Sequence, residues 1–344
     1  MSIGERPGVY TSYTASGVLY GGNSAYAAGV AAQGTAGTVN EIVSITSPAA
    51  ADAHFGAGSG IAGLCTLLFR NGASVVKAVR VSGSYDTAFE LLCADETVKT
   101  IVCDSTSASV HAQLKSAIAE AGESCIHKIG IVEGSGNVSA LTSAAAALNS
   151  ERMVLLSCGG ADENGTAMAS GSAAAAMAGV ILSQTDAALP LNGAALRGVA
   201  GANASYSDGD VTLLVRGGVT PIETGGGNAL VVRGITTRTA TAGSADTTWR
   251  ELNTVLVVDD VIPTVRDALK SGFSRAKNTA QTRAAIRTRV IIELESKLRA
   301  EIIDGYGSVS VTQDADDPTV CNVAFDFTVA HGLNRIIVSA YITV

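Results

Sequence analysis

The glycine-rich stretch at residues 58–63, Gly-Ser-Gly-Ile-Ala-Gly, has the spacing of a loop that cradles a dinucleotide pyrophosphate. Such a loop should follow a buried strand and open a helix, so that the helix N-terminus faces the phosphates. Here residues 49–55, which precede it, have a helical pattern, and the next strand ends at Arg80 instead of an acidic residue. Arginine suits a 2′-phosphate, so an NADP-type Rossmann-like oxidoreductase is one alternative. The favoured interpretation is a glycine-rich entry to a helix.

The other reactive side chains form no recognised catalytic or metal-binding pattern. The four histidines are not at metal-ligand spacing, and Ser157 does not lie in a nucleophile elbow. The six cysteines form no CxxC pair and are interpreted as buried or half-buried thiols of a reducing compartment. We therefore expect a protein that is not an enzyme, with no catalytic residue, no cofactor and no metal.

The composition limits the class of partner. The chain has 344 residues and a net charge of −8, which argues against a nucleic-acid-binding protein. It is 47% hydrophobic but only 4% aromatic, so its apolar residues are mostly small and each buries little area. This composition suits a protein that completes its burial against copies of itself. The apolar stretch at 169–182 is too short to span a bilayer, so no membrane insertion is expected.

Strand and helix patterns alternate from about residue 39 to residue 190. Strands are predicted at 39–45, 74–81, 100–103, 127–132 and 153–157, and helices at 49–69, 87–92, 110–121, 138–148 and 166–184. Repeated βα units of this length predict an α/β fold with a doubly wound, mostly parallel sheet.

The pattern changes after this α/β region. Residues 210–216 and 228–237 are rich in strand formers and are predicted to form a hairpin with a long loop. A helix is expected at 259–273, with Pro263 in its first turn, and a second helix at 279–304. The apolar stripe of the second helix is Ala284, Ile291, Leu294, Leu298 and Ile302. Strands at 309–312 and 320–329 then predict an α+β C-terminal domain.

Both ends of the chain have the pattern of an arm strand. Residues 335–344 alternate apolar and mixed side chains up to the last residue, with no polar tail. The apolar face of this segment consists of Ile336, Val338, Ala340, Ile342 and Val344. An exposed strand of this kind must pair, either within its own sheet or with a neighbouring subunit. A second strand-forming segment near the N-terminus, with Val9, Tyr10, Thr11 and Tyr13, favours exchange between subunits.

A basic patch interrupts this acidic chain between residues 265 and 290, where seven cations accompany a single acid, Asp267. Its central members are Lys270, Arg275, Lys277, Arg283 and Arg287. Two interpretations stay open: a solvated helix face, or a docking surface for an acidic partner. Nucleic acid is a weaker candidate, because no aromatic residues alternate with the cations.

Four segments resemble the contractile tail sheath proteins of phages and phage-tail-like bacteriocins. They are Arg-Pro-Gly-Val-Tyr at 6–10, the Phe-Gly, Asn-Gly and Val-Arg-Val pattern within 54–81, Leu-Pro-Leu-Asn-Gly at 189–193, and the pattern at 231–279. The last is the most specific, because the order and spacing of its residues persist over about 50 residues.

The resemblance implies a structural subunit that polymerises helically around an inner tube and contracts to drive that tube through a target envelope. It implies an N-terminal arm at 1–20, an outer α/β domain at 21–238, a tube-proximal C-terminal domain at 239–334 and an arm strand at 335–344. The basic patch becomes the tube-facing surface. The implied partners are other copies, the inner tail tube, and baseplate and tail terminator proteins, in a virion or tail-like particle assembled in the bacterial cytoplasm. Another self-assembling shell protein is the second alternative.

Overall fold

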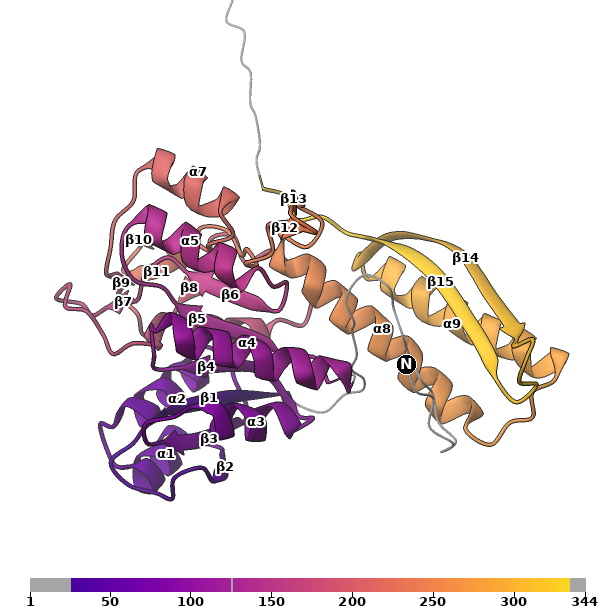
Figure 1. The fold of residues 1–344 in the computed structure, drawn as a ribbon, viewed down its shortest axis with the longest axis horizontal. Helices are drawn as coiled ribbons and strands as arrows, with labels where there is room; N and C mark the ends of the chain where they lie inside the picture. Colours follow the sequence, from indigo (N-terminus) through magenta and orange to yellow (C-terminus); the bar gives the residue numbers. More distant parts are fainter. Residues whose placement is uncertain (1–25, 125, 335–344) are drawn as a thin grey trace, which may run out of the picture.

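The computed structural model describes residues 26–124 and 126–334, so both predicted arm strands lie outside the described residues. Within this range, Figure 1 shows an α/β part and a smaller part made of two long helices and a hairpin.

A six-stranded sheet forms the centre of the α/β part, in the order β2-β3-β1-β4-β5-β6 (Figure 1). The strands are β1 (Ala27–Gln33), β2 (Ile42–Ile45), β3 (Val76–Val81), β4 (Val98–Cys103), β5 (Ile129–Glu133) and β6 (Met153–Leu156). Every neighbouring pair is parallel except β2 and β3. The mostly parallel sheet expected from the alternating pattern is therefore present.

Helices cover both faces of this sheet. They are α1 (Pro48–Phe55), α2 (Gly60–Arg70), α3 (Asp86–Ala94), α4 (Ala108–Glu123), α5 (Val138–Leu148), α6 (Ser172–Ser183) and α7 (Asp208–Arg216). Helices α1, α2 and α6 pack into one hydrophobic core, and α3, α4 and α5 into the other. Each parallel strand is consequently buried on both faces.

The sequence pattern does not predict β1, although this strand lies between β3 and β4 at the centre of the sheet. Its sequence, AAGVAAQ, is rich in alanine and glycine, which have low strand propensity. Space explains the choice of residues: a Cβ added at Gly29 would lie 3.0 Å from a methyl carbon of Val98 and 3.2 Å from Ile101. Close packing on both faces overrides local propensity here.

Two helices replace the single helix predicted at 49–69. Helix α1 ends at Gly56, which has a φ of 90°, and α2 begins after the Ser59 cap. A Cβ at Gly56 would come within 2.0 Å of the Thr35 hydroxyl oxygen, so only glycine fits there.

The strand predicted at 210–216 is wrong, because these residues belong to α7. The Ser207 side chain accepts from the Asp210 N–H, and the Asp210 carboxylate accepts from the Ser207 N–H, which is a capping box. The observed hairpin pairs β10 (Ile222–Gly225) with β11 (Asn228–Val231). The remaining short strands are β7 (Gly160–Ala161), β8 (Ala195–Leu196), β9 (Gly201–Ala202), β12 (Ala240–Thr241) and β13 (Ser244–Ala245).

The smaller part contains α8 (Leu252–Phe273), α9 (Ala280–Arg299), β14 (Ile303–Gln313) and β15 (Cys321–Val329). Helix α8 begins earlier than predicted, so Pro263 lies inside it and not in its first turn. The early turns of α8 are buried in the α/β part through Leu252 and Val255, and the later turns in the core of the smaller part through Val261. One helix therefore runs through both parts.

A buried ion pair reinforces this connection. Arg152, just before β6, places Nη1 2.5 Å from Asp259 Oδ2 on α8, and both side chains are less than a tenth exposed. Lys297 on α9 similarly lies 2.5 Å from Asp260. A buried pair that loses one partner leaves an uncompensated charge, so the Arg152–Asp259 contact favours one arrangement of the two parts.

The apolar stripe predicted for α9 is partly wrong. Leu294 and Ile302 are buried as expected, and Ile291 and Leu298 are half-buried. Ala284 is exposed, and Ile286 and Val290 take the buried positions instead. The true stripe follows the face that meets α8 and β14.

Candidate assembly surfaces

The β14–β15 hairpin is the main candidate for a contact between subunits. Its strands pair antiparallel over 11 and 9 residues and form a two-stranded sheet. Among the residues that the structure describes, neither strand has a second strand beside it. Both outer edges therefore present backbone groups of the kind that another strand can pair with.

The inner face of the hairpin is incompletely covered. Along β15, Val323, Phe325 and Phe327 pack against the core of the smaller part but stay half-buried, whereas the alternate residues are exposed. Period-two alternation places these apolar side chains on the face that meets α8 and α9. Two strands shield this apolar layer only in part, so additional strands would complete it.

The predicted basic patch divides into two groups. Lys270, Arg275 and Lys277 lie at the end of α8 and in the turn to α9 and are exposed, and their side chains make no hydrogen bond or ion pair with another described residue. Arg283 Nη1 instead donates to Asn278 Oδ1 at 2.9 Å and to Gln313 Oε1 at 3.2 Å.

Arg287 belongs with Arg283, because its Nε donates to the Val309 carbonyl at 2.9 Å. Both arginines therefore fasten α9 to its surroundings. The three cations at the α8–α9 turn are the members whose charge is available to a partner.

The geometry at residues 58–63 does not form a dinucleotide site. Helix α1, and not a strand, comes directly before these residues. The Ser59 hydroxyl caps α2 by accepting from the Ala62 N–H at 3.4 Å. Arg80 donates to the carbonyl oxygens of Gly34 at 2.9 Å and Gly37 at 2.6 Å, so its guanidinium holds the loop after β1.

Glu133, which the sequence analysis did not single out, occupies the end of the sheet where α/β proteins often bind phosphate. Its carboxylate accepts from the backbone N–H groups of Gly171 at 2.8 Å, Ala173 at 2.7 Å and Ala174 at 3.4 Å, at the start of α6. Burial raises the pKa of Glu133, and the three amide hydrogen bonds oppose that rise. A side chain of the protein thus fills the anion position of this helix.

Replacing Glu133 should therefore weaken the fold. In Glu133→Ala, buried amides at the start of α6 lose their acceptor, and we expect the free energy of unfolding to fall by about 2–4 kcal/mol. Glu133→Gln keeps one acceptor oxygen and should lose less. Denaturant unfolding of the two variants measures the difference, and equal losses would contradict this capping role.

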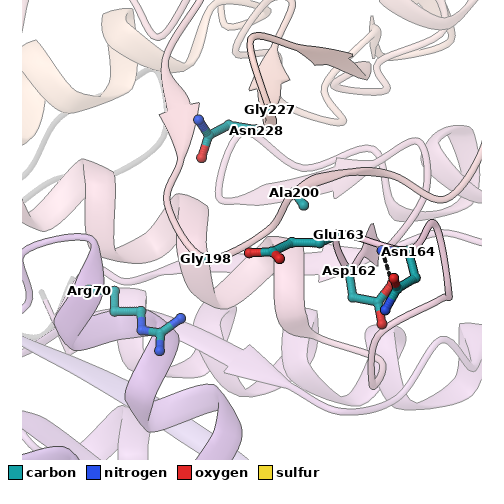
Figure 2. Close-up of a pocket in the computed structure, with 8 residues that line it drawn as sticks. All are labelled: Arg70, Asp162, Glu163, Asn164, Gly198, Ala200, Gly227 and Asn228. Atoms are coloured by element: carbon teal, nitrogen blue, oxygen red, sulfur yellow. Dashed lines mark hydrogen bonds between the residues drawn. The ribbon is translucent and has the colours of Figure 1, made fainter.

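An open surface cavity of about 400 Å³ lies between Arg70, the turn at residues 162–164, and the loops around Gly198 and Asn228. Figure 2 shows the residues that line it. The Asp162 carboxylate accepts from the N–H groups of Asn164 and Thr166, so it stabilises its own turn. The lining is polar and mostly exposed, and no ligand is assigned to it.

His111, Cys65 and Cys103 are buried inside the fold. His111 Nε2 lies 2.9 Å from the Ser105 carbonyl oxygen, and burial lowers its pKa. Burial raises the pKa of Cys65 and of Cys103 to about 12, which disfavours a reactive thiolate.

Three or more metal-binding side chains do not come together anywhere in residues 26–124 and 126–334. Over the same residues, no helix is both long enough and apolar enough to cross a bilayer.

Comparisons with solved structures show where this fold occurs. The helical sheath of the anti-feeding prophage in its contracted state has a TM-score of 0.74 at 14% identity, covering 98% of this chain and 99% of that one. The sheath tail protein of Desulfitobacterium hafniense has a TM-score of 0.69 at 12% identity, covering 94% of this chain and 100% of that one. The fold described above is therefore the fold of these sheath proteins.

Comparisons of sequence point to the same group. The tail sheath protein of Bacillus phage SP01 is 30% identical over 135 residues, which is 39% of this chain and 23% of that protein. The chain thus matches less than a quarter of this relative's length. The model of the phage tail sheath protein central domain matches residues 80–237, and that of the phage tail sheath C-terminal domain matches residues 244–343. These two models cover 158 and 100 of the 344 residues, and the dinucleotide-binding alternative is not supported. The chain therefore belongs to the phage tail sheath family.

Proposed function

We propose that this chain is the repeating subunit of a contractile tail sheath. It polymerises helically around an inner tube and contracts to drive that tube through a target envelope. Its partners are other copies of itself, the tube protein, and baseplate and terminator proteins of a virion or tail-like particle. The observation that carries the proposal is the β14–β15 hairpin, whose two outer edges have no neighbouring strand within residues 26–334 as described, in a chain with a predicted arm strand at each end.

Strand exchange through this hairpin would hold neighbouring subunits together. An arm from another copy would continue the sheet at an open edge through main-chain hydrogen bonds, each contributing about 1 kcal/mol net. Its alternate apolar side chains would extend the cover over α8 and α9. In this proposal, residues 335–344 and the segment at 9–13 are the donated strands, and β14 and β15 are the acceptors.

The exposed cations of the α8–α9 turn would face the tube. Lys270, Arg275 and Lys277 lie on a chain of net charge −8 without a charged partner among the described residues. Such a segregated positive surface favours an acidic partner and increases the rate of its association.

Contraction would reorient whole subunits. Helix α8 belongs to both hydrophobic cores, and the Arg152–Asp259 pair fastens them, so each subunit would move largely as one body. The arms would keep the subunits connected during this rotation. New burial and charge pairing between subunits would supply the free energy.

Electron microscopy of the purified chain at increasing concentration tests this function. We expect hollow helical tubes with a lumen wide enough for a second tube. Closed shells or flat layers would support a different self-assembling protein instead. Single small particles at every concentration, with or without an added tube protein, would contradict the proposal.

A further inference from the structure

The segment after β15 crosses back to the α/β part and meets residues 189–192. Asn192 Nδ2 donates to Asn334 Oδ1 at 2.7 Å. Gly332 lies directly against Pro190: a Cβ added at Gly332 would be 2.8 Å from the Pro190 Cβ and 3.0 Å from its Cγ. Side-chain carbons do not approach this closely, so this contact requires glycine at position 332.

The segment that receives this contact is itself held firmly. Leu191 is buried in the α/β core and packs against Gly234, and the Gly193 N–H donates to the Val231 carbonyl at 2.7 Å. Ala187 packs against the cores of both parts of the molecule. Residues 187–193 therefore form a fixed platform at the place where the two parts join.

Two large apolar side chains are exposed beside this contact. Leu189 is 53% exposed and Leu333 is 70% exposed, and each adjoins one of the contacting residues in sequence. Removing an exposed leucine side chain from water stabilises the state that covers it. The position of Leu189 and Leu333 is consistent with a surface that becomes covered on assembly.

We propose that residues 189–192 anchor the root of the C-terminal arm, so that Gly332 and Asn334 set the point and the direction from which residues 335–344 reach a second copy of this chain. This inference rests on the proposed function, because it assumes that the arm is donated. It also assigns a role to the Leu-Pro-Leu-Asn-Gly segment, for which the sequence alone indicated no role.

The physical reason is the effective concentration of the arm at its acceptor. With the root anchored, the proposed donated strand 335–344 follows the anchor directly, and with the root released after Val329, residues 330–334 become an additional linker before it. An additional linker spreads the strand over a larger volume and so lowers its effective concentration at the acceptor. Loss of the starting direction lowers it further.

Four variants and one truncated chain test the anchor. Asn334→Ala removes the hydrogen bond, Gly332→Ala introduces the Cβ clash with Pro190, and Gly332→Val enlarges it. Gly63→Ala is the matched control, because a Cβ there meets no atom within 4 Å. A chain ending at residue 334 removes the arm. The measurement is the lowest protein concentration at which tubes sediment, together with the thermal midpoint of the unassembled chain.

We expect that concentration to rise about twofold for Asn334→Ala and about tenfold for Gly332→Val, with Gly332→Ala between them. The control, Gly63→Ala, should form tubes at the same lowest concentration as the unmodified chain. If the truncated chain fails to assemble while all the anchor variants assemble normally, the anchor is wrong and arm donation stands. If the truncated chain assembles normally, arm donation is wrong, and the anchor proposal, which assumes donation, is wrong as well. If Gly332→Val lowers the thermal midpoint, loss of stability is a second explanation for its assembly defect. Asn334 is exposed, so Asn334→Ala then tests the anchor without that complication.

Discussion

A chain that ends at Asn334 should fold normally but fail to form tubes at concentrations where the full chain assembles. Among the described residues, the three hydrophobic cores consist of residues between Ala27 and Val329, and a chain ending at Asn334 keeps all of these side chains. The thermal midpoint of the monomer should therefore change little. Assembly should suffer, because each subunit loses a donated strand and the open edge of its neighbour stays unpaired.

The expected loss of assembly is large. An arm gains main-chain hydrogen bonds and apolar burial, and most of that gain is offset by the entropy of ordering ten residues. A surplus of only about 3 kcal/mol per arm would still correspond to more than a hundredfold in the association constant. Sedimentation across a concentration series measures this change directly.

Two single substitutions provide a matched control for the truncation. Val338 belongs to the apolar face of the predicted arm strand, whereas Ser339 belongs to the opposite face. Val338→Asp should abolish tubes, and Ser339→Asp should leave them intact. If the chain ending at Asn334 forms tubes at the same concentration as the full chain, strand donation by this arm is wrong.

Reversing the three exposed cations of the α8–α9 turn should detach the sheath from its tube without preventing self-assembly. Lys270→Glu, Arg275→Glu and Lys277→Glu together move the net charge from −8 to −14, because each reversal removes two positive units. An acidic partner would then be repelled where it was attracted. Cosedimentation with tube protein should fall by about tenfold or more, and binding of the unmodified chain should weaken as salt is added.

The control for this variant has the same net charge. Arg70, Arg197 and Arg216 are exposed on the α/β part, and none of them forms an ion pair with a described residue. Reversing these three should leave tube binding unchanged. If the two triple variants lose binding equally, total charge and not the position of the patch is responsible, and the docking proposal is wrong.

Arg283 and Arg287 are unsuitable for this test, although their spacing places them on one helix face. Their guanidinium groups donate to Gln313 and to the Val309 carbonyl of β14. Reversing their charge would place carboxylates against these oxygen atoms and loosen the hairpin. Any loss of tube binding would then have two causes.

Local patterns were sufficient where an element has a strong period of its own. Helix α5 begins and ends at the predicted residues, and strands β3 to β6 lie within one or two residues of their predicted starts. The capping box that starts α7 was also readable, because Ser207 and Asp210 are three residues apart, but the strand-forming residues after it concealed the signal. Repeats of apolar residues and caps act over a few positions, so the chain contains this information directly.

Contacts between distant segments were decided by packing alone. Strand β1 exists because its small residues fit between two helical layers, and no local pattern marks it. Glu133 meets the start of α6 across 38 residues, and Asn192 meets Asn334 across 142. The early start of α8 follows from the burial of its first turn in the α/β core. In each case the stabilising free energy comes from surfaces that meet only after the chain has folded, so residue types and their spacing along the sequence do not contain it.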